Sequence, residues 1–412
     1  MMAANNPPSA TLPARPRNAL SAIIRNASDG PEPASDPAWQ DVEQVLLSHF
    51  HKPDIEAVKV FFACVAAHKI TDFPMAWLMI VAPPGSLKTA LLESLRFLNL
   101  NIHYIDEFTG NTFISGKLND SWLPSLQKAS APASLLHRIG TEGIMVNADF
   151  GTVINLNRNV RGSVLAQLRR IYDGRLRREF GTNENLDERE WQGRLTLLVG
   201  VTPDVDKHHA LFQALGERFL YVRSDRAGGI DAGLKAIGQT TDVQLELQAV
   251  VLCFLSPTLD QRPVSAPRIP QEYHNRISAL GELVVRARAD VPRHRFTRQI
   301  EGEAVIESNT RCPQQLMQVA RGWAVCSGRS EVNGEDYSLA VRVAFDSVPP
   351  IRAKVIKTLS AGREPYTIDA PGAVVNRALE DLEVVKLVSQ TTQGKWILCA
   401  LTCDLLKQAR VI

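Results

Sequence analysis

The chain has 412 residues, 45% of them hydrophobic, which is typical of a soluble protein and enough for two or three domains. Its 46 basic and 44 acidic residues leave a net charge of +2, so any nucleic-acid surface must come from local clusters of charge. No apolar run approaches the ~18 residues of a membrane span, and no apolar signal core is present. The six cysteines form no CxxC pair, which argues against a disulfide scaffold or zinc site and favours a reduced cytosol. Together with the lack of an apolar span, this predicts a cytoplasmic protein without membrane contact.

Residues 1–36 are rich in Pro, Asn, Ala and Ser, and bury too little apolar surface to offset their ordering entropy. They are therefore predicted to be mostly disordered. From Pro37 to Lys69, apolar residues recur three and four positions apart, which predicts helices. The apolar run AWLMIVA (residues 76–82) then predicts a buried parallel strand, followed by a tight loop and a helix from Lys88.

Two further apolar runs, Gly143–Phe150 and Arg194–Pro203, predict buried strands with helical stretches between them. This alternation predicts an α/β domain with a parallel sheet, over residues 37–230. The strand signals stop after Asp225, and residues 231–348 are predicted to be helical on either side of a proline-rich break. The last segment, 349–412, predicts two helices and then a hairpin that turns at Gln393–Gly394.

The loop after the first predicted strand carries most of a phosphate-binding (P-loop) pattern, GxxxxGK[ST]. In such a loop the main-chain N–H groups and the lysine hold phosphates, and the Ser or Thr binds Mg²⁺. Residues 82–89 read APPGSLKT, so Lys88 and Thr89 are in register, while Ala82 and Leu87 replace the two glycines. Gly85 is expected to supply part of the lost backbone freedom. The flanking strand and helix favour ATP binding over an incidental Lys-Thr pair; the predicted contacts are Pro84, Gly85, Ser86, Leu87, Lys88, Thr89 and Ala90.

An ATPase also needs a carboxylate at a neighbouring strand end to hold Mg²⁺. Asp106-Glu107 is one candidate, but it comes soon after the P-loop helix. Asp149, which ends the more apolar strand, is preferred. Phe150 then occupies the position expected for a catalytic Glu, so the carboxylate that activates water stays unassigned, with Glu107 as a candidate.

Two residues further along are candidates for contact with the γ-phosphate. Thr202 ends the strand LLVGV and is placed either to reach the γ-phosphate or to be an ordinary strand-end Thr. Arg218 precedes another apolar stretch and suits an arginine finger that acts across a subunit boundary. The alternative for Arg218 is a surface salt bridge with Glu217.

In this order the motifs resemble those of AAA+ ATPases, and within them the minichromosome-maintenance (MCM)-like helicase branch, from about Pro37 onward. APPGSLKT resembles Walker A, IMVNADF a divergent Walker B, LLVGVTP sensor 1, and LGERFLYVR the arginine-finger segment. Residues 310–348 are similar to the helical lid that carries sensor 2, and Arg311 matches its arginine. The resemblance implies an AAA+ core, a lid over residues 231–348, and ATP with Mg²⁺ as ligands. The departures at Leu87 and Phe150 bear on hydrolysis more than on binding.

The same resemblance implies two contacts with DNA. In the MCM-like branch a hairpin that enters a central pore follows Walker B, and this chain has an arginine-rich stretch there. The candidate contacts in it are Arg169, Arg170, Arg175, Arg177 and Arg178; the alternative is a solvated helix face or a subunit interface. Residues 349–412 resemble a winged helix with a recognition helix near Ala373–Val385, and its candidate contacts are Arg377 and Lys395. Winged helices also bind proteins, so that alternative stays open.

The leading interpretation is an ATP-driven ring motor that acts on DNA, with Arg218 and Arg311 completing a site shared between subunits. A finger that acts across a boundary requires a head-to-tail interface, for which a hexameric ring is the expected closure. Protein partners in replication or mobile-element maintenance would suit such a motor. The alternatives are a remodeller or loader that acts on a protein, and a weakly hydrolysing, nucleotide-dependent DNA-binding switch.

Overall fold

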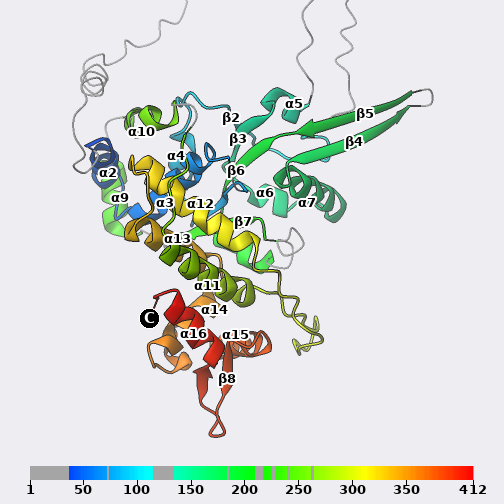
Figure 1. Cartoon of the computed structure of the whole chain (residues 1–412), viewed down its shortest axis with the longest axis vertical. Helices are drawn as coiled ribbons and strands as arrows, with labels where there is room; N and C mark the ends of the chain where they lie inside the picture. Colours follow the sequence, from blue (N-terminus) through cyan, green and yellow to red (C-terminus); the bar gives the residue numbers. More distant parts are fainter. Residues whose placement is uncertain are drawn as a thin grey trace, which may run out of the picture.

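A five-stranded parallel sheet lies at the centre of the computed structural model, which describes residues 37–71, 74–114, 134–182, 185–208, 217–224, 228–238, 242–260 and 264–411 (Figure 1). The order across the sheet is β2-β3-β6-β1-β7, and each neighbouring pair runs parallel. The strands are β1 (Trp77–Val81), β2 (Ile102–Tyr104), β3 (Glu142–Asn147), β6 (Arg194–Val201) and β7 (Phe219–Arg223). The expected α/β class with a parallel sheet is thereby confirmed.

Side chains of β1 alternate between two hydrophobic clusters, one on each face of the sheet. Leu78 and Ile80 belong to the first cluster. Trp77, Met79 and Val81 belong to the second. Because both faces are covered, a strand can be apolar at every position, which explains the uninterrupted apolar run in the sequence.

Helices cover both faces of the sheet. The first cluster packs α2–α4 and α10–α13 on one face, and the second packs α5–α7 on the other (Figure 1). The helices are α2 (Pro37–His49), α3 (Ile55–Ala67), α4 (Lys88–Glu93), α5 (Leu135–Ile139), α6 (Gly151–Ile154), α7 (Arg158–Tyr172), α9 (Ile230–Ile237), α10 (Val243–Leu259), α11 (Gln271–Ala287), α12 (Arg311–Cys326), α13 (Gly334–Asp346), α14 (Pro350–Ser360), α15 (Gly372–Val384) and α16 (Ala400–Gln408), with short 3-10 helices at Pro203–His208 and Pro365–Thr367.

Helices α3 and α12 meet closely at Gly322. A β-carbon at Gly322 would lie 1.9 Å from the main-chain oxygen of Ala63, a distance that no side chain tolerates. This contact holds the C-terminal half of α12 (Arg311–Cys326) closely against α3.

Substituting Gly322 by alanine should destabilise the fold by about 3 kcal/mol, because the two helix backbones must separate. Gly162 in α7 is a matched control, since a β-carbon there meets no atom within 4 Å. Gly162→Ala should stabilise the protein by about 0.5–1 kcal/mol, because glycine is unfavourable inside a helix. Denaturant unfolding of the two variants measures both values, and equal effects would show that the α3–α12 contact is not tight.

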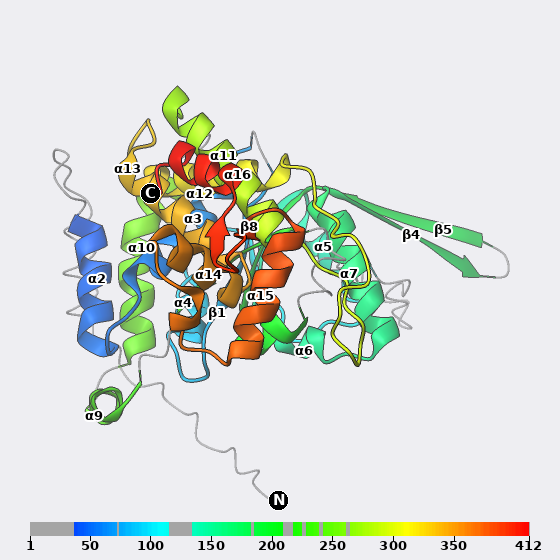
Figure 2. The ribbon, with the colours of Figure 1, turned by 90° about the horizontal axis from the view of Figure 1, so that it is seen from below.

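Strands β4 (Arg175–Thr182) and β5 (Asn185–Gln192) form a separate antiparallel hairpin. Both views show it projecting away from the sheet, beyond α7 (Figures 1 and 2). Its base is tightly packed: Gly174 has φ +82°, and a β-carbon at Gly193 would lie 2.5 Å from the oxygen of Thr141. The resemblance predicts a hairpin between the second and third apolar runs, and one is present there.

The C-terminal segment contains α14, α15 and α16 with a small antiparallel sheet of β8 (Val388–Gln390) and β9 (Trp396–Leu398). The hairpin turns as expected, with Gly394 at φ +79° and the amide of Thr391 bonded to the oxygen of Lys395 at 2.8 Å. Buried side chains of this segment belong to the same cluster as those of α11–α13. The Tyr337 hydroxyl also donates to the oxygen of Ala409 at 2.6 Å, so α13 and the end of the chain are joined.

The tail predicted to be disordered, residues 1–36, lies outside the described residues. Across the ranges that are described, no helix combines the length and apolar character needed to cross a membrane.

Candidate nucleotide site and a second arginine site

The predicted nucleotide residues gather at one edge of the sheet. Strands β1, β6 and β3 are adjacent and parallel, so their carboxyl ends lie side by side. The P-loop follows β1, Thr202 follows β6, and Asp149 comes just after β3. Thr202 therefore stands between the lysine loop and the acidic residue.

The loop does not need the glycine that the sequence lacks. Leu87 has φ −60° and ψ −12°, ordinary helical angles that any L-residue adopts. The positive φ of +74° falls on Gly85, where a β-carbon would meet nothing within 4 Å. Gly85 thus supplies the backbone freedom, as expected, and the loop keeps open space above it.

Main-chain oxygens at the carboxyl ends of β1 and β6 hold the Lys88 ammonium. Its Nζ donates to the oxygen of Ala82 at 3.1 Å and to that of Val201 at 3.3 Å. Burial lowers the pKa of Lys88 from its usual value, and the nearby Asp149 carboxylate partly offsets this effect. The ammonium is thus placed between β1 and β6 with two weak acceptors that a phosphate would readily replace.

Gly200 on β6 leaves room for the Lys88 side chain between β1 and β6. It is not among the residues predicted from the sequence. A β-carbon at Gly200 would lie 2.9 Å from Cγ of Lys88 and 2.7 Å from the oxygen of Ala148. The available signal was a glycine inside an otherwise apolar strand, which often marks the close approach of another group.

A cavity of about 260 Å³ opens over the loop. Its walls are the P-loop residues, the 49–54 segment between α2 and α3, and Ala232 and Ala236 of α9. The Lys235 ammonium donates to the oxygen of Phe50 at 3.0 Å and joins α9 to that segment. Helices are predicted in both regions, but their place beside the loop is not, because apolar periodicity identifies helices and not what lies beside a distant loop.

Asp149 and Phe150 have opposite environments. Asp149 is exposed at the sheet edge, and its Oδ1 accepts from the amide of Gly151 at 3.1 Å. Phe150 is fully buried, with its ring 5.8 Å from that of Phe108 and 5.7 Å from that of Phe219. The position expected for a catalytic Glu is therefore part of the core.

The competing acidic pair lies farther from the lysine. Asp106 and Glu107 follow β2, which is the outer strand, and Asn147 Nδ2 ties that strand end to β3 through the oxygen of Ile105 at 2.5 Å. Three strand spacings of ~4.8 Å separate β2 from β1, against two for β3. Asp149 is thus the better placed of the candidate metal ligands.

The residues present suit a nucleotide with Mg²⁺. The exposed Thr89 and Asp149 offer oxygen ligands of the kind that Mg²⁺ prefers, and a metal held by few protein groups keeps its waters. The open space at Gly85 leaves room for phosphates near the main chain.

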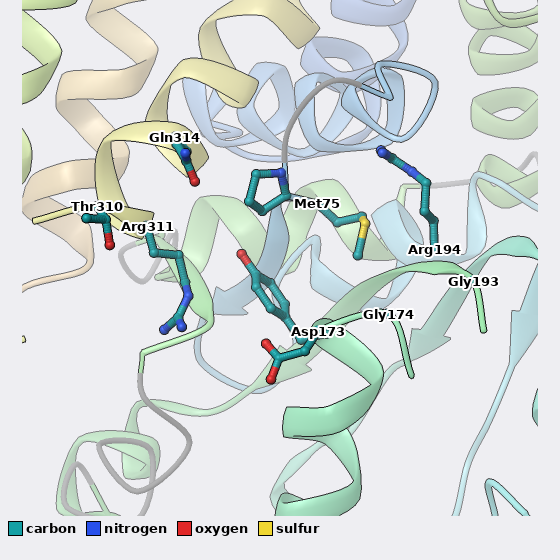
Figure 3. Close-up of a pocket in the computed structure, with 10 residues that line it drawn as sticks. Met75, Asp173, Gly174, Gly193, Arg194, Thr310, Arg311 and Gln314 are labelled. Atoms are coloured by element: carbon teal, nitrogen blue, oxygen red, sulfur yellow. The ribbon is translucent and has the colours of Figure 1, made fainter. Parts of the chain in front are cut away.

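Arg218 and Arg311 lie at the opposite edge of the sheet. Arg218 precedes β7, and Arg311 borders a cavity of about 470 Å³ that is also lined by Met75 before β1 and Arg194 at the start of β6 (Figure 3). Strand β1 alone has five residues, so about 16 Å of strand separates this edge from the P-loop. Neither arginine is therefore placed to reach the Lys88 of its own chain.

The two arginines share one aromatic and one acidic neighbour. Arg218 is 6% exposed, and its Nη2 lies 2.9 Å from each carboxylate oxygen of Asp173. The guanidinium carbons of Arg218 and Arg311 lie 5.4 Å and 5.8 Å from the Tyr172 ring. Figure 3 shows Arg311 extending from the start of α12 toward Asp173.

Positive charge is concentrated here beside the Asp173 carboxylate. Burial lowers the pKa of Arg218, Asp173 raises it, and nearby Arg311 lowers it further. Arg311 also occupies the first position of α12, where the helix dipole disfavours a cation. Asp173 is the only carboxylate among the described residues lining the cavity, so an added anion would be stabilised there.

The alternative for Arg218, a surface salt bridge with Glu217, is wrong. Glu217 is buried and faces Arg288, with 3.8 Å between Oε2 and Nη1. Burial raises the pKa of Glu217 to about 7. Glu217 and Arg218 therefore point into different surroundings, and Arg218 forms its ion pair with Asp173.

The arginines predicted to contact DNA do not form one basic surface. Arg169 and Arg170 are exposed in the last turn of α7. Arg178 turns inward and donates to the oxygens of Gly110 and Ile114, both at 2.8 Å. On the other face of the hairpin, Arg175 pairs with Glu190 and Arg177 lies 3.6 Å from Glu179. Residues 175–192 hold four arginines and five carboxylates.

The candidate contacts in the C-terminal segment are separated as well. Arg377 is exposed on α15, which matches the expected recognition helix within a residue at each end. Lys395 follows the turn of the β8–β9 hairpin, and its Nζ lies 3.2 Å from Glu364.

No family model and no curated protein sequence matches this chain.

Proposed function

We propose that the chain is an ATP-binding and hydrolysing AAA+ ring motor of the MCM-like kind that acts on DNA. The observation that carries the proposal is the grouping at one sheet edge of Lys88, Thr202 and Asp149, beside a loop with its left-handed residue at Gly85. On this proposal, residues 231–348 are the lid and residues 349–412 are a winged helix.

At the nucleotide edge, each residue has a separate task. The P-loop amides and the Lys88 ammonium would bind the phosphates, with Thr202 directed at the γ-phosphate or the attacking water. Thr89 and Asp149 would hold Mg²⁺, which when bound neutralises charge on the phosphate oxygens. Because Phe150 supplies no carboxylate, turnover is expected to be slow.

The second arginine site gives the proposal its oligomeric form. Arg218 and Arg311 lie at the far edge of the sheet, so the phosphates that they would neutralise belong to a neighbouring chain. A head-to-tail contact repeated in one direction closes into a ring when the rotation between neighbouring chains divides a full turn. The site is then complete only between two chains.

Two observations favour a second candidate, a weakly hydrolysing nucleotide-dependent switch. The hairpin expected to grip DNA is not basic overall, and the catalytic carboxylate position is filled by buried Phe150. Such a protein would bind ATP tightly but turn it over slowly, at a rate that DNA does not change.

ATPase assays with and without a single-stranded oligonucleotide, run beside sizing in ATP, test the proposal. We expect the 45.5 kDa chain to assemble in ATP and its rate to rise several-fold with DNA. A monomer with full activity would contradict the ring. An assembled ATPase that DNA does not stimulate would contradict the motor and favour action on a protein.

A further inference from the structure

The loop between α11 and α12 presents an aromatic and two arginines at its tip. Phe296 is 82% exposed, and the Arg295 guanidinium carbon lies 5.7 Å from its ring centroid. Arg295 and Arg298 are both exposed, and neither has an ion-pair partner among the described residues. Residues 292–298 hold three arginines and a histidine but no carboxylate.

The loop is braced rather than loose. Isolated bridges pair Asp290 with Val305 and Arg293 with Ile300. Nearer the tip, the amide of His294 donates to the oxygen of Gln299 at 2.8 Å.

Two further bonds close the tip. The amide of Arg298 donates to the oxygen of His294 at 3.0 Å, and the amide of Thr297 donates to Nδ1 of His294 at 3.1 Å. The tip is therefore preformed with its large apolar ring in water, an arrangement that adds nothing to the hydrophobic core.

Arg293 fixes this loop to α15. Its Nε and Nη2 lie 2.9 Å and 2.6 Å from Asp381 Oδ1, and Nη2 also lies 2.9 Å from Glu380. Nη2 donates further to the oxygen of Arg377 at 3.2 Å, and Nη1 donates to that of Arg298 at 2.7 Å.

These bonds pair Arg293 with two of the three carboxylates of α15, Glu380 and Asp381. They also hold the base of the tip against α15, at the main-chain oxygen of Arg377. Figure 2 shows the loop running alongside α15.

We infer that the tip, Arg295, Phe296 and Arg298, binds single-stranded nucleic acid, with one base stacked on Phe296 and the two arginines on flanking phosphates. An exposed aromatic ring between unpaired arginines suits a single strand of nucleic acid. Any base can stack on the ring, and each phosphate in the backbone carries a negative charge that an arginine can neutralise. The choice of ligand rests on the proposed function, whereas the contact itself requires no ATP.

Fluorescence anisotropy of a labelled oligo(dT) with the full chain, measured without ATP, tests this inference. Phe296→Ala should weaken binding by about tenfold, the usual effect of losing one base stack. The matched control is Phe97→Ala, which removes a ring that is 57% exposed elsewhere and should leave affinity unchanged.

The double variant Arg295→Ser/Arg298→Ser should flatten the slope of log affinity against log salt concentration by about 1.4, for two lost phosphate contacts. Arg96→Ser/Arg268→Ser removes the same charge from arginines that pair with Glu93 and Glu331, and should change the slope much less. Equal slopes in the two double variants would overturn the inference.

Two outcomes separate this inference from the proposed function. If the wild-type protein hydrolyses ATP and Phe296→Ala keeps its affinity for oligo(dT), the loop contact is wrong and the proposed function stands. Absent ATPase activity with the expected loss of affinity overturns the motor and leaves the contact standing. If Phe296→Ala instead impairs self-association while affinity for oligo(dT) is kept, the tip is a protein contact and the inference fails.

Discussion

Lys88→Ala should lower the ATP hydrolysis rate by about a hundredfold or more, because on the proposed function the variant removes the cation that would face the β- and γ-phosphates. ATP affinity should fall as well. The fold should persist, since among the described residues the Lys88 ammonium is hydrogen-bonded only to two main-chain oxygens and to no buried carboxylate. Phosphate release and titration with a fluorescent ATP analogue measure the two effects.

Lys354→Ala is the matched control, since Lys354 is exposed on α14, far along the chain from the loop. It should hydrolyse ATP at the wild-type rate. If Lys88→Ala keeps full activity, including stimulation by DNA, the assignment of residues 82–89 as the nucleotide loop is wrong.

Arg311→Ala should separate ATP binding from hydrolysis. The variant keeps its own P-loop, so it should bind ATP as the wild type does, while the assembled protein hydrolyses about a hundredfold more slowly. Arg311 is the better of the two arginines to replace, because Arg218 is buried and removing its side chain would disturb the packing around it.

A mixing experiment then tests whether the site is shared. A Lys88→Ala chain carries an intact arginine edge, and an Arg311→Ala chain carries an intact nucleotide edge. Where they meet in the right order, one complete site forms, so a mixture of two inactive proteins should regain activity. Activity that stays at the average of the two parents would place the whole site within one chain.

Local pattern was enough to predict the main elements of the fold. The run before the P-loop is apolar at every position because both faces of β1 are buried, and this made the strand recognisable. Strand β2 is only three residues long and half-buried, so its run is too short to stand out. Pairing across the sheet, which sets the order β2-β3-β6-β1-β7, depends on contacts far apart in sequence, and no local pattern reports it.

The candidate site likewise contains residues that local sequence predicts and residues that it does not. Lys88, Thr89 and Asp149 follow from motif spacing, because each closes a strand or opens a helix. The neighbours that hold them, such as Gly200 against Lys88 and Asp173 against Arg218, come from other elements. The arginine-rich stretch shows the limit of composition, since Arg175 and Arg178 sit on opposite faces of one strand and take different partners.

Strand β6 has a mechanical consequence for a ring of such chains. It begins at Arg194, on the wall of the arginine cavity, and ends at Val201, whose oxygen receives the Lys88 ammonium. Because β6 is buried and hydrogen-bonded to a strand on each side, a displacement of one end would displace the other. In the proposed ring, β6 of each chain would then couple its own nucleotide site to that of its neighbour. Such coupling would set the order in which successive sites hydrolyse ATP.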